Sequence, residues 1–109
     1  MATPIERDEL RVKLADGTIR LVDAQAPGWY EREHLPGALR AAAEDVDGLL
    51  HGLGTDLNAE IAVYCWNAAC TGSDYVATQL EARGYHNVRR YVGGKQDWAE
   101  AGLPIETKR

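Results

Sequence analysis

The chain has 109 residues, of which 45% are hydrophobic and 27% are charged, and 17 acidic residues against 12 basic ones give a formal net charge of -5. This composition fits one globular domain over residues 1–109 and excludes a disordered or fibrous protein. An acidic chain without a basic run is a poor partner for nucleic acid, because Lys and Arg supply most of the affinity for phosphate. No apolar stretch approaches the roughly 20 residues that cross a bilayer, so no membrane partner is expected.

The beginning of the chain and its cysteine content bear on the compartment. Residues 1–9 are polar and acidic, with no basic region followed by an apolar one, so no secretory signal is expected. Two cysteines cannot form the dense disulfide framework of a small secreted domain. We therefore expect a cytoplasmic protein, either a monomer or a weak homodimer.

Helical and strand patterns alternate along the chain. In order, they predict a helix over 8–15, a strand over 19–24, a helix over 44–53, a strand over 61–65, a helix over 73–82, a strand over 88–92 and a helix over 96–101. The run 61–65 is almost wholly apolar, which is typical of a parallel strand covered on both faces. The alternation predicts an α/β fold with a central, mostly parallel sheet and helices on both faces. Ligands of such folds bind at the carboxyl ends of the strands, which here means Cys65.

Cys65 is followed by a loop of mostly small residues and then by a helix that Ser73 or Thr71 is expected to cap. Backbone N–H groups of such a loop, with a helix N-terminus behind them, form a concave site for anions. A thiol that faces those donors has its thiolate form stabilised, and the thiolate is the nucleophile. A buried structural cysteine is the alternative, but a plain strand-to-helix connection takes about 2–6 residues and rarely needs seven. The predicted loop is Trp66, Asn67, Ala68, Ala69, Cys70, Thr71 and Gly72.

Four short motifs occur in a fixed order along the chain. They are Leu21-Val22-Asp23, His34-Leu35-Pro36-Gly37-Ala38, Val63-Tyr64-Cys65, and Gly93-Gly94 followed by Trp98 and Gly102-Leu103-Pro104. Together they resemble the motifs of the single-domain rhodanese-like sulfurtransferases over nearly the whole chain. The resemblance implies a sheet of about five parallel strands and a catalytic role for Cys65. It implies no cofactor and no metal.

The resemblance also implies a reaction. Cys65 would take a sulfane sulfur from a donor such as thiosulfate or a persulfide, hold it as a persulfide, and pass it to a thiophilic acceptor, as in a thiosulfate:cyanide sulfurtransferase. This is covalent catalysis in two steps, with residues 66–72 as the substrate-binding loop. The partners are then a small sulfur donor and a small acceptor, with a protein acceptor as an alternative.

The chain departs from the family pattern at the loop. Families of this kind have a shorter loop that usually ends in Arg, whereas Gly72 stands at that position here and Gln25 stands where the first strand motif often has Arg. Residues 41–82 contain seven acids and no Lys or Arg. Any cation near the loop must come from elsewhere, with Arg89, Arg90 and Lys95 as candidates or else as ordinary solvated residues. These departures weaken the expectation for thiosulfate, because a dianion is normally met by a cation.

Other functions remain open for the same cysteines. Cys65 and Cys70 could form a disulfide and act as a redox switch, although Cys70 is more simply a packed loop residue. A catalytically weak interaction module is a further alternative. A cysteine phosphatase needs an Arg at the far end of the loop, which is missing, and the sequence neither supports nor excludes arsenate reduction. A zinc site is disfavoured, because the three histidines are scattered over different elements.

Several residues are expected to serve the fold. His34 should order its turn through a side-chain hydrogen bond, and Asp23 should be a hydrogen-bond partner at a strand end. Trp29, Tyr30 and Trp98 are expected to be core or partly buried anchors. Trp66 could wall the pocket, cover the loop or dock a partner, and the sequence does not choose among these.

Overall fold

The computed structural model describes residues 2–25, 28–41, 46–54, 56–66 and 72–107. The strands are β1 (Thr3–Ile5), β2 (Ile19–Asp23), β3 (Leu39–Arg40), β4 (Glu60–Tyr64) and β5 (Val88–Tyr91). The helices are α1 (Arg7–Asp16), α2 (Trp29–Arg32), α3 (Val46–Leu53), α4 (Gly72–Ala82) and α5 (Gly94–Glu100).

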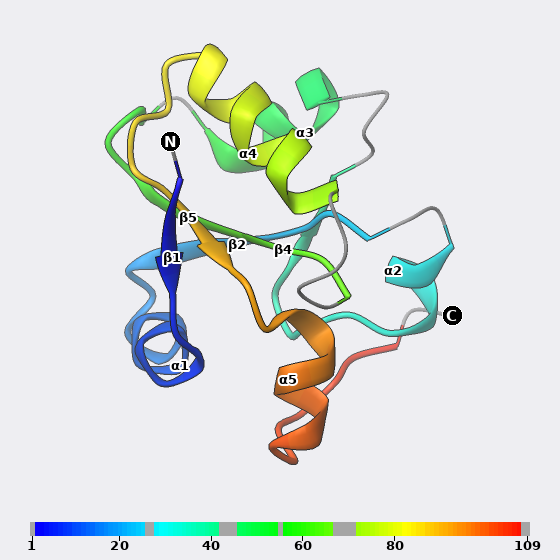
Figure 1. Ribbon diagram of the computed structural model, residues 1–109. Coiled ribbons are helices and arrows are strands. Elements are labelled where there is room, and N and C mark those ends of the chain that lie inside the picture. The colour runs from blue at the N-terminus through cyan, green and yellow to red at the C-terminus, as the bar shows by residue number, and fades with distance from the viewer. Residues whose placement is uncertain (1, 26–27, 42–45, 55, 67–71, 108–109) are drawn as a thin grey trace.

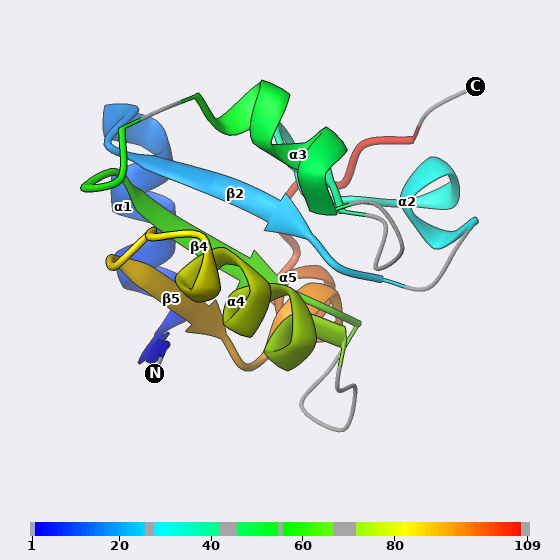
Figure 2. The same ribbon diagram turned by 90° about the horizontal axis from the view of Figure 1, so that it is seen from above.

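The five strands form one parallel sheet in the order β1-β5-β4-β2-β3 (Figure 1). Helices α3 and α4 lie on one face of the sheet, and α1 and α5 lie on the other (Figures 1 and 2). Helix α2 and the end of the chain lie beyond the carboxyl ends of the strands (Figure 1). The predicted α/β fold with a parallel sheet between helices is confirmed.

Strand β4 lies in the middle of the sheet, and its side chains contribute to both halves of the core. Its side chains alternate between faces, so that Ile61 and Val63 pack in the cluster that includes residues of α3 and α4, whereas Ala62 and Tyr64 pack in the cluster with α1 and Trp98. All four are fully buried. The near-continuous apolar run of this strand therefore follows from its two covered faces.

The predicted strands 19–24, 61–65 and 88–92 are each found within one residue of their predicted bounds, and residues 44–45 of the predicted helix 44–53 lie outside the described residues. The observed elements differ from the prediction in three further respects. The short strands β1 and β3 and the four-residue helix α2 were not in the predicted pattern, because elements this short contain too few residues to show a period. Helix α4 begins at Gly72, so the expected capping role of Ser73 is wrong and Ser73 lies inside the helix. Helix α5 begins at Gly94, two residues before the prediction.

In the described part of the chain, no helix combines the length and the apolar character that crossing a membrane requires.

Candidate active site

Cys65 directly follows β4 and lies at the carboxyl edge of the sheet, between the ends of β2 and β5. Its side chain is buried, and its Sγ lies 3.6 Å from the carbonyl oxygen of Ala24, the residue after β2. The Ala24 N–H donates to the Tyr64 carbonyl at 2.8 Å, which extends the pairing of β2 with β4 to the edge of the site. The position of the sulfur is therefore set by the rigid centre of the sheet.

The backbone around Cys65 is held from the other side by α5. The N–H groups of Lys95 and Gln96 donate to the carbonyls of Cys65 and Trp66 at 3.0 and 2.8 Å. Gly94 allows this close approach, because it has a φ of +67° and a Cβ there would lie 2.4 Å from the Cys65 carbonyl oxygen. The Gly93-Gly94 motif thus fixes α5 against the residues that begin the loop.

Gly72, where the family usually has Arg, begins α4 in close contact with β2. A Cβ at this position would lie 2.6 Å from the Ala24 carbonyl oxygen and 3.7 Å from Cys65 Sγ. Such a contact with backbone forces a movement of the chain. The position therefore admits no side chain unless the start of α4 moves.

A buried polar network lies under the site. The Tyr64 hydroxyl donates to Asp23 Oδ2 at 2.5 Å and accepts from the Leu35 N–H at 2.9 Å. Asp23 also accepts from the backbone N–H and the side-chain Nε2 of Gln25, both at 2.8 Å. Burial raises the pKa of Asp23, although its hydrogen bonds oppose that shift, and burial next to Asp23 raises the pKa of Tyr64. The expected structural role of Asp23 is confirmed.

Gln25 is committed to this network and is not an anion ligand. Its Nε2 donates to Asp23 and also to the Glu33 carbonyl at 3.1 Å, which fixes the orientation of the amide, because its oxygen could not bond either acceptor. Its Oε1 is buried without a hydrogen-bond partner. The position where the family often has Arg thus contributes no charge to the site.

The three predicted cations each have an acidic partner. Arg89 donates to Glu9 and Glu60, and Arg90 lies 2.9 Å from Asp74. Lys95 is only 5% exposed, and its Nζ lies 3.0 Å from Glu33 Oε1. The expectation that these residues are ordinary solvated residues is wrong for Lys95, which is buried beside the site.

Trp66, the residue that follows Cys65, stacks on Trp29. Their ring centroids are 5.9 Å apart with an interplanar angle of 13°, and they remain 51% and 40% exposed. The guanidinium of Arg32 and the Nζ of Lys95 lie 5.2 and 5.4 Å from the centroid of Trp29. The prediction of Trp29 as a core or partly buried anchor is wrong, because its side chain is exposed, whereas Trp98 is buried and Tyr30 is partly buried, as predicted.

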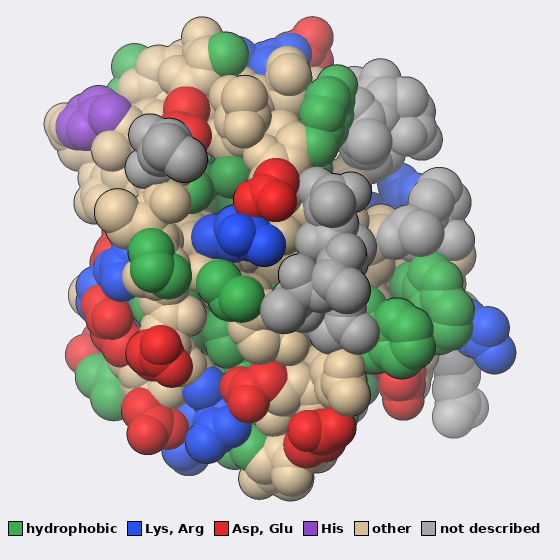
Figure 3. Space-filling model, in the orientation of Figure 1, with side chains coloured by type: hydrophobic (Ala, Val, Ile, Leu, Met, Phe, Trp, Pro, Cys, Tyr) green, Lys and Arg blue, Asp and Glu red, His purple; other side chains and the backbone are tan. Residues whose placement is uncertain are grey.

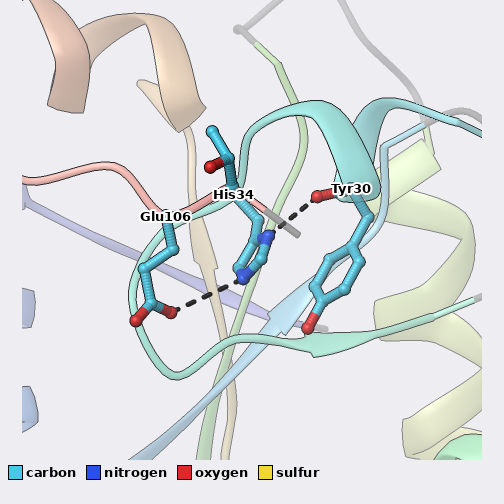
Figure 4. Close-up of a pocket in the computed structure, with 4 residues that line it drawn as sticks. Tyr30, His34 and Glu106 are labelled. Carbon is cyan, nitrogen blue, oxygen red and sulfur yellow. Dashed lines mark hydrogen bonds and ion pairs between the residues drawn. The ribbon is translucent and has the colours of Figure 1, made fainter. Parts of the chain in front are cut away.

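His34 lies in a separate pocket of about 390 Å³, lined by Tyr30, His34, Glu106 and Thr107 (Figure 4). Its Nδ1 lies 2.7 Å from the Tyr30 carbonyl oxygen, and its Nε2 lies 3.5 Å from Glu106 Oε1. The backbones of His34 and Glu106 also pair, with N–H to O distances of 2.9 and 2.8 Å. The imidazole thus orders its turn and fastens the end of the chain, as its predicted structural role requires.

The oxidation state of Cys65 decides whether its sulfur can act as a nucleophile. Cys65 is disulfide-bonded in this structure, so its sulfur is shown in an oxidised state. The chain has one other cysteine, Cys70. The predicted loop residues Asn67, Ala68, Ala69, Cys70 and Thr71 lie outside the described residues, so the predicted backbone cradle is described only at its two ends, Trp66 and Gly72.

Sequence reasoning missed two contributors to the site. The Ala24 carbonyl acts through its backbone, which no side-chain motif reveals. Arg32 lies over the ring of Trp29, which stacks on Trp66, and the only signal for this pair was a group of two aromatic residues before the His34 turn. Among the described residues, no cluster of three or more His, Cys, Asp or Glu side chains could hold a metal ion.

A parallel sheet between two helical layers, with a cysteine at the end of its central strand and a helix N-terminus behind it, defines the class of site. A family model for the rhodanese-like domain matches residues 6–101. The chain belongs to the rhodanese-like domain family.

The relatives with similar sequences include proteins with different named functions, a transcriptional regulator and a thiosulfate sulfurtransferase. The chain is 31% identical over 103 residues to the HTH-type transcriptional regulator Rv0324 of Mycobacterium tuberculosis, a match that covers 94% of this chain and 44% of the regulator. It is 36% identical over 52 residues to the thiosulfate sulfurtransferase GlpE of Actinobacillus succinogenes, a match that covers 48% of this chain and 45% of that protein. The matched region is therefore less than half the length of either relative.

Solved structures confirm the fold. The human single-domain sulfurtransferase TSTD1 superposes with a TM-score of 0.77 at 24% identity, over 92% of this chain and 97% of that one. The BH2092 protein of Bacillus halodurans gives a TM-score of 0.85 at 22% identity, over 97% of this chain and 77% of the other.

Proposed function

We propose that the protein is a sulfurtransferase in which Cys65 carries sulfur as a persulfide. The observation that carries this proposal is the place of Cys65 at the end of β4, next to the start of α4, in a rhodanese-like domain. The reacting form is the reduced cysteine, so a cytoplasmic setting, which keeps thiols reduced, belongs to the proposal.

The first half-reaction loads the sulfur. The Cys65 thiolate attacks the outer sulfur of the donor, the S–S bond of the donor breaks, and sulfite leaves from thiosulfate or a thiolate leaves from an organic persulfide. In the second half-reaction a nucleophile such as cyanide attacks the outer sulfur of the Cys65 persulfide, and the Cys65 thiolate leaves. Helix α4 begins at Gly72, close to this sulfur, and the positive end of its dipole would stabilise negative charge there.

The site favours a persulfide over thiosulfate as the donor. Thiosulfate is a dianion, and the three candidate cations are already paired with carboxylates. The partner of Arg89 is Glu60, at the other end of β4 from Cys65. The position that usually holds Arg cannot take a side chain without moving the start of α4. A small acceptor is proposed for the second step, with a protein acceptor as the alternative.

Intact mass spectrometry tests the proposal. The reduced protein is exposed to thiosulfate or to an organic persulfide, and we expect it to gain the mass of one sulfur, to lose it again to cyanide, and to load faster from the persulfide. Cys65→Ser should gain nothing, whereas Cys70→Ser is the matched control and should load normally. Sulfur gain by Cys65→Ser, or no gain by the wild type with either donor, would overturn the proposal. The protein would then be interpreted as an interaction module.

A second function is favoured by the disulfide at Cys65. We propose that oxidation of two thiols, with loss of two protons and two electrons to a disulfide or peroxide oxidant, blocks the nucleophile and acts as a switch. The oxidised protein should be inactive in sulfur loading until dithiothreitol restores it. Full loading without reductant in a protein whose mass shows it to be oxidised would contradict the switch.

A further inference from the structure

The stacked pair of Trp29 and Trp66, defined here as the indole wall, joins two different parts of the chain, one of which directly follows the proposed nucleophile. Trp66 is the residue after Cys65, and Trp29 is the first residue of α2. Two exposed indoles in contact are not explained by the fold, because neither belongs to the two buried core clusters. Figure 3 shows hydrophobic side chains at the surface over α2, with a basic side chain beside them.

The backbone under Trp66 is fixed. Its carbonyl accepts the hydrogen bond from the Gln96 N–H at 2.8 Å, and the preceding carbonyl accepts from Lys95. Trp29 is oriented in turn by the stack and by the two cations near its ring. The wall is therefore preorganised at the residue that follows Cys65, so a ligand that packs on it needs to order little of the protein.

Arg32 adds a charge that the fold leaves available. Lys95 is paired with Glu33, and Arg40 lies 3.4 Å from Glu31. Arg32 is exposed and has no carboxylate within ion-pair distance among the described residues, and its guanidinium lies over the ring of Trp29. Its guanidinium can therefore receive a carboxylate from a ligand that lies on the wall.

We propose that the indole wall and Arg32 determine the donor, selecting an organic persulfide, R–S–SH, whose R group is apolar near the sulfur and ends in a carboxylate. The R group packs on Trp66, and the carboxylate pairs with Arg32. The Cys65 thiolate takes the outer sulfur together with its hydrogen, the S–S bond breaks, and R–S⁻ leaves. This inference rests on the proposed sulfurtransferase function and names the substrate class for it.

The test compares donors that differ in one feature at a time. The rate of sulfur loading onto Cys65 is measured in single turnovers with thiosulfate, propanethiol persulfide, benzyl persulfide and mercaptopropionate persulfide. Benzyl persulfide reports the apolar contact, and mercaptopropionate persulfide differs from propanethiol persulfide by its carboxylate. We expect the wild type to load fastest from benzyl persulfide and mercaptopropionate persulfide.

Trp66→Ala should lower the second-order loading rate from benzyl persulfide about tenfold, as loss of an aromatic contact predicts, and should change loading from thiosulfate by less than about twofold. Trp66→Phe should keep most of the wild-type rate, and Trp29→Ala should give an intermediate loss. The control is Val12→Ala, which changes an apolar residue that is 60% exposed on α1. A saturating donor should restore the rate, because the loss lies in binding.

Arg32→Gln should lower the rate of loading from mercaptopropionate persulfide about three- to fivefold, the range of an exposed ion pair. It should leave the rate of loading from propanethiol persulfide unchanged. Arg20→Gln, at an exposed position on β2, is the matched control. Equal losses for every donor, or no loss for any, would overturn this inference and leave the sulfurtransferase proposal standing. Wild-type protein that loads from no donor would overturn both.

Discussion

Replacing Gly72 with Ala tests the packing between α4 and β2 that sets the environment of Cys65. The new Cβ would lie 2.6 Å from the Ala24 carbonyl oxygen, whereas Cβ contacts shorter than 3.0 Å are essentially never seen, so the two backbones must separate by at least 0.4 Å, the difference between these values. The Ala24 carbonyl cannot yield easily, because the neighbouring N–H groups of Ala24 and Ala41 are bonded to the ends of β4 and β2. The start of α4 must therefore move.

Two opposing terms decide the effect on stability. Gly to Ala in a helix favours folding by about 0.5–1 kcal/mol, whereas forcing an extra group into a packed contact costs about 1–3 kcal/mol. The contact is with backbone, which places the cost toward the upper part of that range. We expect Gly72→Ala to lower the free energy of unfolding by about 1–2 kcal/mol, as the difference between these terms.

The same movement changes the chemistry, because the Cβ would also lie 3.7 Å from Cys65 Sγ. A displacement of 1 Å near a reacting group can lower a rate about a hundredfold, so a shift of 0.4 Å should lower sulfur loading about tenfold. Gly72→Arg should behave no better, since the family's cation would arrive with the same clash at Cβ.

Urea unfolding and single-turnover loading provide the assays, with Gly52→Ala as the matched control. Gly52 is also a helical glycine, but a Cβ there would meet Leu39 Cδ1 at 3.1 Å, a flexible side chain that can turn away. Gly52→Ala should therefore be neutral or slightly stabilising. A Gly72→Ala protein with wild-type stability and loading rate would refute the conclusion that the Ala24 carbonyl leaves no room for a side chain at position 72.

Two further predictions concern buried and paired carboxylates, whose pH dependences have opposite signs. Asp23→Asn should destabilise the protein by about 1–3 kcal/mol through mismatched hydrogen bonds with Tyr64. Burial raises the pKa of Asp23, so between the pKa of the unfolded chain and that of the folded protein only the folded protein keeps the proton on Asp23. Urea unfolding should therefore show that the difference in free energy of unfolding between wild type and Asp23→Asn becomes smaller as the pH rises through this range. Glu60→Gln should also cost about 1–3 kcal/mol at neutral pH. Burial of Glu60 opposes the shift, but the hydrogen bonds from Lys13 and Arg89 win and lower its pKa, so its contribution is present above the unfolded pKa and should disappear as the pH falls below it. A pH-independent difference for either variant would contradict the corresponding assignment.

The position of the proposed nucleophile could be predicted because it depends on short-range patterns. The apolar run that ends at Cys65 is long enough to indicate a doubly covered strand, and parallel α/β folds bring the carboxyl ends of their strands to one edge. Asp23 could be assigned a structural role from its place at the end of another strand. Its partner could not be named, because the pairing of Asp23 with Tyr64 is set by the register of β2 against β4.

Contacts between segments that are distant in the sequence could not be predicted from it. Trp29 and Trp66 each looked like a separate aromatic residue, and nothing local indicates that the turn into α2 brings them together. Gly28, which precedes α2 with a φ of +90°, sets the direction from which that helix starts. The position of Cys65 could therefore be predicted from the sequence, whereas the stacking of Trp29 on Trp66 is visible only in the folded chain.

The two glycines on either side of the sulfur have a common consequence. Gly72 lets α4 begin against β2, and Gly94 lets α5 begin against the carbonyls of Cys65 and Trp66. Because both positions are closed to side chains by backbone atoms, neither helix can present a charged residue from its first position to the sulfur. Under the proposed function, donor recognition would then come from the indole wall and Arg32. Such a site would distinguish donors by the organic group attached to sulfur more strongly than by the charge of an inorganic one.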